Sequence, residues 1–99
     1  MNNKTLILDI AMNLNRVGNW AADNFSAKEK RIYFFLDQTT RYIESLDASL
    51  FSERFKTTFN RFVKDYRSIV ENKKPKDSLA WAEKLMTWGN ILTHRSKLL

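Results

Sequence analysis

Apolar residues recur along the chain at alternating spacings of three and four positions, which is the period of an α-helix rather than a β-strand. This periodicity predicts four helices, near residues 5–23, 27–46, 48–72 and 78–97. The apolar stripe of the first segment contains Ile7, Ile10, Leu14, Val17 and Ala21, and that of the second contains Ile32, Phe35, Leu36, Ile43 and Leu46. The third segment has the clearest stripe, which consists of Phe51, Phe55, Phe59, Phe62, Tyr66 and Ile69.

Four amphipathic helices of similar length, joined by short connections, predict an all-α fold, an antiparallel up-down four-helix bundle. Residues 1–99 would then form a single helical domain. The alternative architecture is a pair of helical hairpins that is completed only by dimerisation. Both arrangements bury one stripe from each helix.

Polar residues between the stripes predict where the helices begin and end. Ser26, followed three residues later by Glu29, is a capping-box pattern and predicts the start of the second helix. Asp47 is the expected cap of the third helix, which the proline of "NKKPKDS" ends. Asp77 or Ser78 is expected to cap the fourth helix.

The segment "LAWAEKLMTWGNILTHR" contains two tryptophans and the chain's only histidine, a combination that would also suit a ligand-binding or base-stacking site. On a helical wheel, Trp81 and Trp88 lie within about 60° of Leu85, on the stripe that should face the core. Gly89 lies beside that stripe, where it would let a neighbouring helix approach closely. His94 lies on the opposite, solvent-facing side. We therefore interpret this segment as part of the core.

The amino-acid composition excludes several classes of protein. Only two glycines and one proline leave no room for the many turns of an all-β fold, and an aromatic content of 13% argues against disorder. The absence of cysteine excludes disulfides and thiolate metal sites and fits a reducing compartment. The apolar runs are too short for a membrane span, and no signal peptide is recognisable. We expect a cytoplasmic protein.

Motifs for catalysis or cofactor binding are absent from the sequence. A di-iron bundle needs Glu-x-x-His motifs on facing helices, and this chain has one histidine, in the context "THR". It also has no glycine-rich phosphate-binding motif. We therefore expect no enzymatic activity, no cofactor, no metal and no small-molecule site.

The net charge of +6 lies entirely in the second half of the chain, with +2 on residues 48–72 and +4 on residues 73–99. Such an excess can bind phosphate groups, so nucleic acid is a possible partner. The candidate contacts are Lys64, Arg67, Lys73, Lys74 and Lys76. Glu53, Asp65 and Glu71 dilute the charge of the third helix, and an ordinary solvated basic surface is the alternative.

A few apolar residues fall outside the core stripes. Leu8 and Met12 lie opposite Ile10 and Leu14, and Phe34 lies about 100° from Phe35 on the helical wheel. A cluster of exposed apolar residues marks a contact surface. We therefore favour a small module that acts through protein–protein contacts or self-association, with Leu8, Met12 and Phe34 as contacts. Membrane binding is disfavoured, because all four helices are amphipathic and can cover one another.

Overall fold

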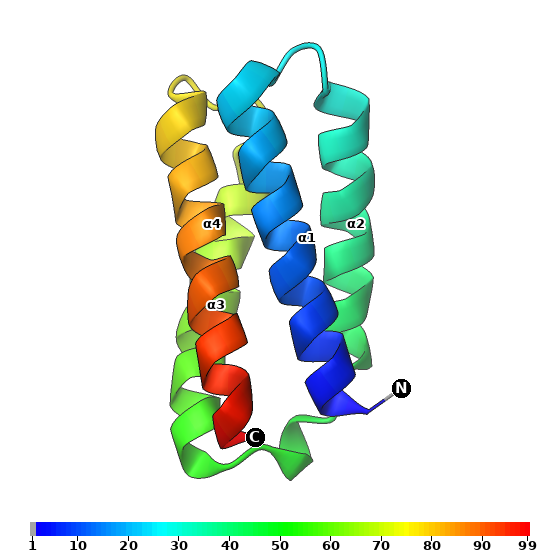
Figure 1. The fold of residues 1–99 in the computed structure, drawn as a ribbon, viewed down its shortest axis with the longest axis vertical. Coiled ribbons are helices and arrows are strands. Elements are labelled where there is room, and N and C mark those ends of the chain that lie inside the picture. The colour runs from blue at the N-terminus through cyan, green and yellow to red at the C-terminus, as the bar shows by residue number, and fades with distance from the viewer. Residues whose placement is uncertain (1) are drawn as a thin grey trace.

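The computed structural model describes residues 2–99, which form an all-helical structure with four α-helices packed as a four-helix bundle (Figure 1). The α-helices are α1 (Asn3–Asn24), α2 (Glu29–Ser45), α3 (Glu53–Glu71) and α4 (Ser78–Arg95). Two short 3₁₀ turns follow α2 and α4, namely η1 (Ala48–Leu50) and η2 (Ser96–Leu98). In Figure 1 the chain rises through α1 and α3 and descends through α2 and α4. The predicted all-α bundle is confirmed.

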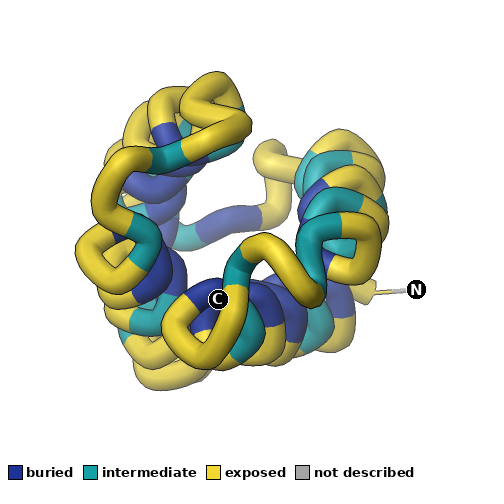
Figure 2. The backbone as a smooth tube through the Cα atoms, turned by 90° about the horizontal axis from the view of Figure 1, so that it is seen from above, coloured by how far each residue is buried: buried dark blue, intermediate teal, exposed yellow. Residues whose placement is uncertain are grey.

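The predicted stripes form the core, which appears as the dark inward-facing part of the tube in Figure 2. Every residue of the stripes predicted for the first and third segments is buried, as are Trp81, Leu85 and Leu92 of α4. On α2 the buried apolar residues are Ile32 and Leu36, while Phe35 and Ile43 are half-buried against the core. His94 is exposed, as predicted.

The closest helix pair is α1 and α4, which approach each other through small residues. A Cβ atom at Gly89 would lie 2.7 Å from Asn15 Nδ2 and 3.0 Å from the backbone oxygen of Ala11. A Cβ atom at Gly18 would lie 3.0 Å from the backbone oxygen of Ala82. The predicted role of Gly89, to permit close helix packing, is confirmed, and Gly18 serves the same contact from the other helix.

Helix α3 is packed differently, because phenylalanine rings rather than small residues face the core. The rings of Phe51 and Phe55 lie 4.9 Å apart between centroids, and those of Phe59 and Phe62 lie 6.0 Å apart. These large side chains hold the backbone of α3 away from the other helices, which it approaches much less closely than α1 approaches α4.

A polar contact links α2 to α3 among these phenylalanine rings. The hydroxyl of Tyr66 donates a hydrogen bond of 2.8 Å to the backbone oxygen of Leu36 and lies 3.0 Å from Thr40 Oγ1. Burial raises the pKa of the Tyr66 hydroxyl to about 12, because ionisation would place a charge in the core.

The capping box predicted at Ser26 is wrong. Helix α2 begins at Glu29, and its N-cap residue, Lys28, makes no side-chain capping bond. Instead, Asn24 Oδ1 accepts a hydrogen bond of 3.1 Å from the backbone nitrogen of Ala27. Asn24 thereby supports a turn that continues from α1, so the new helix starts two residues later than the pattern suggested.

The third helix begins later than predicted, at residue 53 rather than 48. Asp47 does act as a cap, but of η1, where its carboxylate accepts a hydrogen bond from the backbone nitrogen of Ser49. Ser52 caps α3 by accepting from the backbone nitrogen of Phe55. Asp77 caps α4 as predicted. The fourth helix ends at residue 95 rather than 97, and η2 follows it.

We expect Gly89→Val to lower the free energy of unfolding by about 1–3 kcal/mol, because the added atoms would overpack the contact with α1. Asn90→Val is the control, since it places the same side chain on an exposed position of the same helix. Its effect should stay within about 0.5 kcal/mol. Urea unfolding followed by circular dichroism measures both, and equal effects of the two substitutions would contradict the close-packing explanation.

The raised pKa of Tyr66 predicts a loss of stability in alkali. An unfolded tyrosine ionises near its ordinary pKa of about 10. Folded Tyr66 stays protonated until about pH 12. Its contribution is therefore complete below pH 10, and about 2–3 kcal/mol is lost as the pH rises toward 12. Tyr66→Phe should lower stability at neutral pH by about 1 kcal/mol and make the alkaline decline shallower.

Urea unfolding at several pH values between 8 and 12 tests this expectation. Tyr42→Phe, on the neighbouring helix, is the matched control and should keep the decline that is due to Tyr66. A decline of equal size in the wild type and in Tyr66→Phe would show that Tyr66 is not its source.

Candidate functional site

Aromatic and arginine side chains gather on the face that α1 and α2 share. We call this set the α1–α2 aromatic surface and define it as Arg16, Trp20, Arg31, Phe34 and Phe35. The rings of Trp20 and Phe35 meet edge-on across the two helices at 5.2 Å, and those of Phe34 and Phe35 meet at 5.3 Å. These contacts make one continuous layer of three rings.

Each arginine of this surface lies over a ring of the other helix. The guanidinium carbon of Arg16 lies 5.9 Å from the centroid of Phe35, and that of Arg31 lies 5.1 Å from the centroid of Trp20. Such cation–π pairs hold both guanidinium groups at the edge of the apolar layer, where their hydrogen-bond donors remain available to solvent or to a partner.

The position of the surface follows from the sequence of the two helices. Arg16 and Trp20 are one helical turn apart, and both lie outside the stripe of α1 that enters the core. Phe34 is 64% exposed, while Trp20 and Phe35 are half-buried. The buried side chain of Asn13 donates a hydrogen bond of 3.0 Å to Gln38 Oε1 and helps to fix α1 against α2.

An ion pair closes the α1–α2 hairpin near this surface. Lys28 Nζ lies 2.7 Å from Asp23 Oδ2, and the hydrogen bond from Lys28 lowers the pKa of the Asp23 carboxyl. Asp23 is exposed, so this pair contributes little to stability.

The predicted protein contacts are all exposed, although the structure does not bring them into one cluster. Leu8 is 36% exposed and Met12 is 47% exposed. Met12 precedes Arg16 by one helical turn. Leu8 lies about 18 Å from Trp20 along the helix axis, beyond the end of the three-ring layer.

Sequence reasoning identified Phe34 but missed Arg16, Trp20 and Arg31 as its neighbours. The available signal was Trp20, a large apolar residue that lies about 120° from Leu14 on the wheel and so outside the core stripe. Arg16 shares this side of α1. The sequence pattern does not show how α2 is rotated about its own axis. That rotation places Phe35 against Trp20.

The predicted nucleic-acid contacts are exposed but belong to different parts of the surface. Lys74 and Lys76 line the end of a groove between α3 and α4, whereas Lys73 and Lys74 line a second groove between α2 and α3. Lys64 and Arg67 are exposed on α3 and line neither groove. The five residues therefore do not line one common groove.

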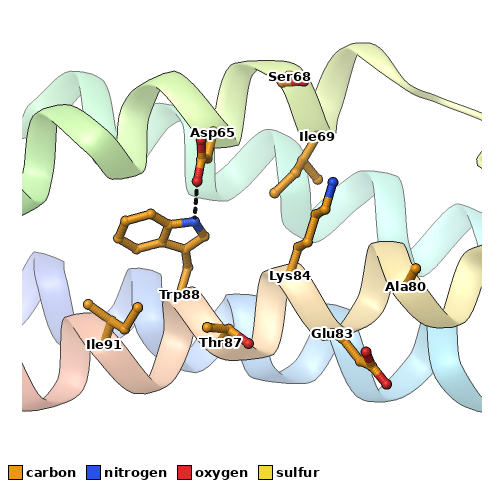
Figure 3. A pocket seen from close by; sticks show the side chains of 9 residues that line it. All are labelled: Asp65, Ser68, Ile69, Ala80, Glu83, Lys84, Thr87, Trp88 and Ile91. Atoms are coloured by element: carbon orange, nitrogen blue, oxygen red, sulfur yellow. Dashed lines mark hydrogen bonds between the residues drawn. The ribbon is translucent and has the colours of Figure 1, made fainter.

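The sequence pattern predicted that Trp88 lies in the core, but in the structure it lies there only in part. Its ring packs 5.5 Å from that of Phe62, but the residue is only half-buried, and its indole nitrogen donates a hydrogen bond of 3.1 Å to Asp65 Oδ2 (Figure 3). The phenylalanine layer keeps α3 at a distance, so the gap beside α4 exposes one side of this tryptophan. Trp81, by contrast, is buried as predicted.

Within residues 2–99, no group of three or more histidine, cysteine, aspartate or glutamate side chains is placed to hold a metal ion. None of the helices in this part of the chain is long and apolar enough to cross a membrane.

Comparison with known proteins gives no match: no protein-family model, no curated protein and no solved structure is significantly similar to this chain. The function of the protein must therefore be inferred from the surfaces described above.

Proposed function

We propose that this protein is a small non-enzymatic interaction module that binds another protein through the α1–α2 aromatic surface. The observation that carries the proposal is the layer of three contacting rings, in which one arginine lies over Trp20 and another over Phe35. Tryptophan and arginine are enriched among the residues that dominate binding energy at protein interfaces. A cytoplasmic location is part of the proposal and is supported by the absence of cysteine.

The chemistry of the surface favours a partner that presents apolar side chains flanked by carboxylates. The rings offer apolar area, and Arg16 and Arg31 can each hold a carboxylate through paired donors. Two-fold self-association would place the same two arginines of each copy in one interface, on chains that each carry a net charge of +6. We therefore favour a different protein over a second copy, which is the competing occupant.

Site-directed photo-crosslinking tests the surface directly. The photo-reactive residue p-benzoylphenylalanine replaces Phe34 in one variant and Leu50 in the control, since Leu50 is also an exposed apolar residue, at 70%. We expect a single adduct from position 34 that Arg16→Glu abolishes, and no such adduct from position 50. An adduct of twice the chain mass would identify self-association, and equal adducts from both positions would overturn the proposal.

The partner identified in this way should bind Phe34→Asp at least about tenfold more weakly, because the substitution replaces the most exposed ring of the apolar layer with a charge. The free energy of unfolding should change by less than about 0.5 kcal/mol, because Phe34 is mostly exposed. Leu79→Asp, at a residue that is 55% exposed in the first turn of α4, is the matched control for affinity. If the partner is a second copy, sedimentation velocity measures the same difference.

The alternative function is nucleic-acid binding, and the exposed lysines of the α3–α4 loop support it. Lys73, Lys74 and Lys76 lie within four residues, and none forms an ion pair within 4.0 Å in the described part of the chain. Three phosphate contacts would make affinity for duplex DNA fall roughly 40-fold between about 50 and about 200 mM salt.

Fluorescence anisotropy with labelled single- and double-stranded DNA and RNA measures this dependence. Under the alternative, reversing the charges of Lys73 and Lys74 abolishes binding, while Lys4→Glu, on α1, leaves it within twofold. Absence of binding at the lower salt concentration would rule out the alternative and leave the basic loop as a solvated surface.

A further inference from the structure

A groove runs along the outside of the bundle between α3 and α4, distant in sequence from the α1–α2 aromatic surface. Three adjoining hollows of about 500, 540 and 450 Å³ form it, and neighbouring hollows share lining residues. Its apolar floor consists of Ile69, Ala80, Trp88 and Ile91. Trp88 and Ile91 are half-buried, so part of their apolar surface remains open to solvent.

Basic side chains border this α3–α4 groove along its whole length. Lys74 and Lys76 lie at one end, Lys84 lies near the middle, and Arg61 and Arg95 lie at the other end. All five residues are exposed, and none forms an ion pair within 4.0 Å among residues 2–99. Their charges are therefore available to an acidic ligand.

The carboxylates near the groove are already engaged or turned away. Asp65 accepts the indole hydrogen of Trp88, and Asp77 caps the N-terminus of α4 through the backbone nitrogen of Ala80. Figure 3 shows Lys84 and Trp88 extending from α4 toward α3, while Glu83 points away from α3. The groove thus combines an apolar floor with unpaired cations on its rim.

We propose that the α3–α4 groove binds an acidic amphipathic helix of another protein. The groove spans α4 from Ala80 to Arg95, or about 22 Å at 1.5 Å per residue, which matches about four turns of helix. The apolar stripe of such a helix would cover the floor, and glutamate or aspartate beside the stripe would meet the lysines and arginines of the rim.

The groove chemistry disfavours other occupants. An extended peptide would find no strand edge here to pair with its backbone groups. A nucleic acid would leave the apolar side chains of Ile69 and Ile91 without a partner. A second copy of this chain carries a net charge of +6 and would repel the basic rim.

Selection from a displayed peptide library tests the proposal. The library contains 18-residue peptides with apolar residues at helical spacing and with all other positions drawn from glutamate, lysine, glutamine, serine and alanine. We expect the selected peptides to be strongly enriched in glutamate beside the stripe. In nitrogen–proton correlation spectra, a selected peptide should shift the indole signal of Trp88 and leave that of Trp20 in place.

Two substitutions separate the contributions of charge and apolar contact. Lys84→Glu should weaken the selected peptide at least tenfold, and Ile91→Gln at least fivefold, as measured by calorimetry, with circular dichroism confirming the fold. Lys30→Glu, on α2, should change affinity less than twofold.

Four outcomes would overturn the proposal. The library could yield no binder, the binders could lack an acidic bias, or Lys84→Glu could leave affinity unchanged. Displacement of the peptide by a single-stranded oligonucleotide or by polyglutamate at equal concentration would show recognition of charge alone. Lys73 does not line the groove. Peptide binding that survives charge reversal at Lys73 therefore distinguishes this site from the nucleic-acid alternative.

Discussion

The close contact between α1 and α4 determines how the rest of the bundle is arranged. At Gly18 and Gly89, atoms of the opposite helix lie where a side chain would begin, so these two backbones approach more closely than larger residues would allow. Helix α3 faces the same core with phenylalanines, which require much more room. The bundle is therefore narrow on one side and wide on the other, and the difference arises from the sizes of the residues at the helix contacts.

This asymmetry also determines where apolar surface remains exposed. On the wide side, the separation of α3 from α4 leaves Trp88 and Ile91 partly open beneath a basic rim. On α1 and α2, the rings outside the core form a layer of their own, with Arg16 and Arg31 fixed above it. One surface is a groove and the other is a layer of three rings, and we assign them to different partners for that reason.

Sequence periodicity predicted the fold because each stripe depends only on the 3.6-residue repeat of its own helix. The exposure of Phe34, Leu8 and Met12 followed from the same local geometry. Ser26 failed as a cap because the competing side chain of Asn24 already stabilised the turn. Trp88 was assigned to the core because its angle on the wheel is correct, whereas its exposure depends on the distance to α3. That distance depends on the sizes of the side chains that meet between helices, and the meeting of Trp20 with Phe35 depends on how α1 and α2 are rotated against each other. Neither can be read from the periodicity of one helix.

The tightest contact of the bundle joins the first of its four helices to the last. Contacts between segments far apart in sequence require the closure of a long loop, which slows folding relative to contacts between neighbours. During synthesis, the side of α1 that contains Ala11 and Gly18 stays exposed until α4 has emerged from the ribosome. The contact on which the bundle depends can therefore form only after the last helix is present.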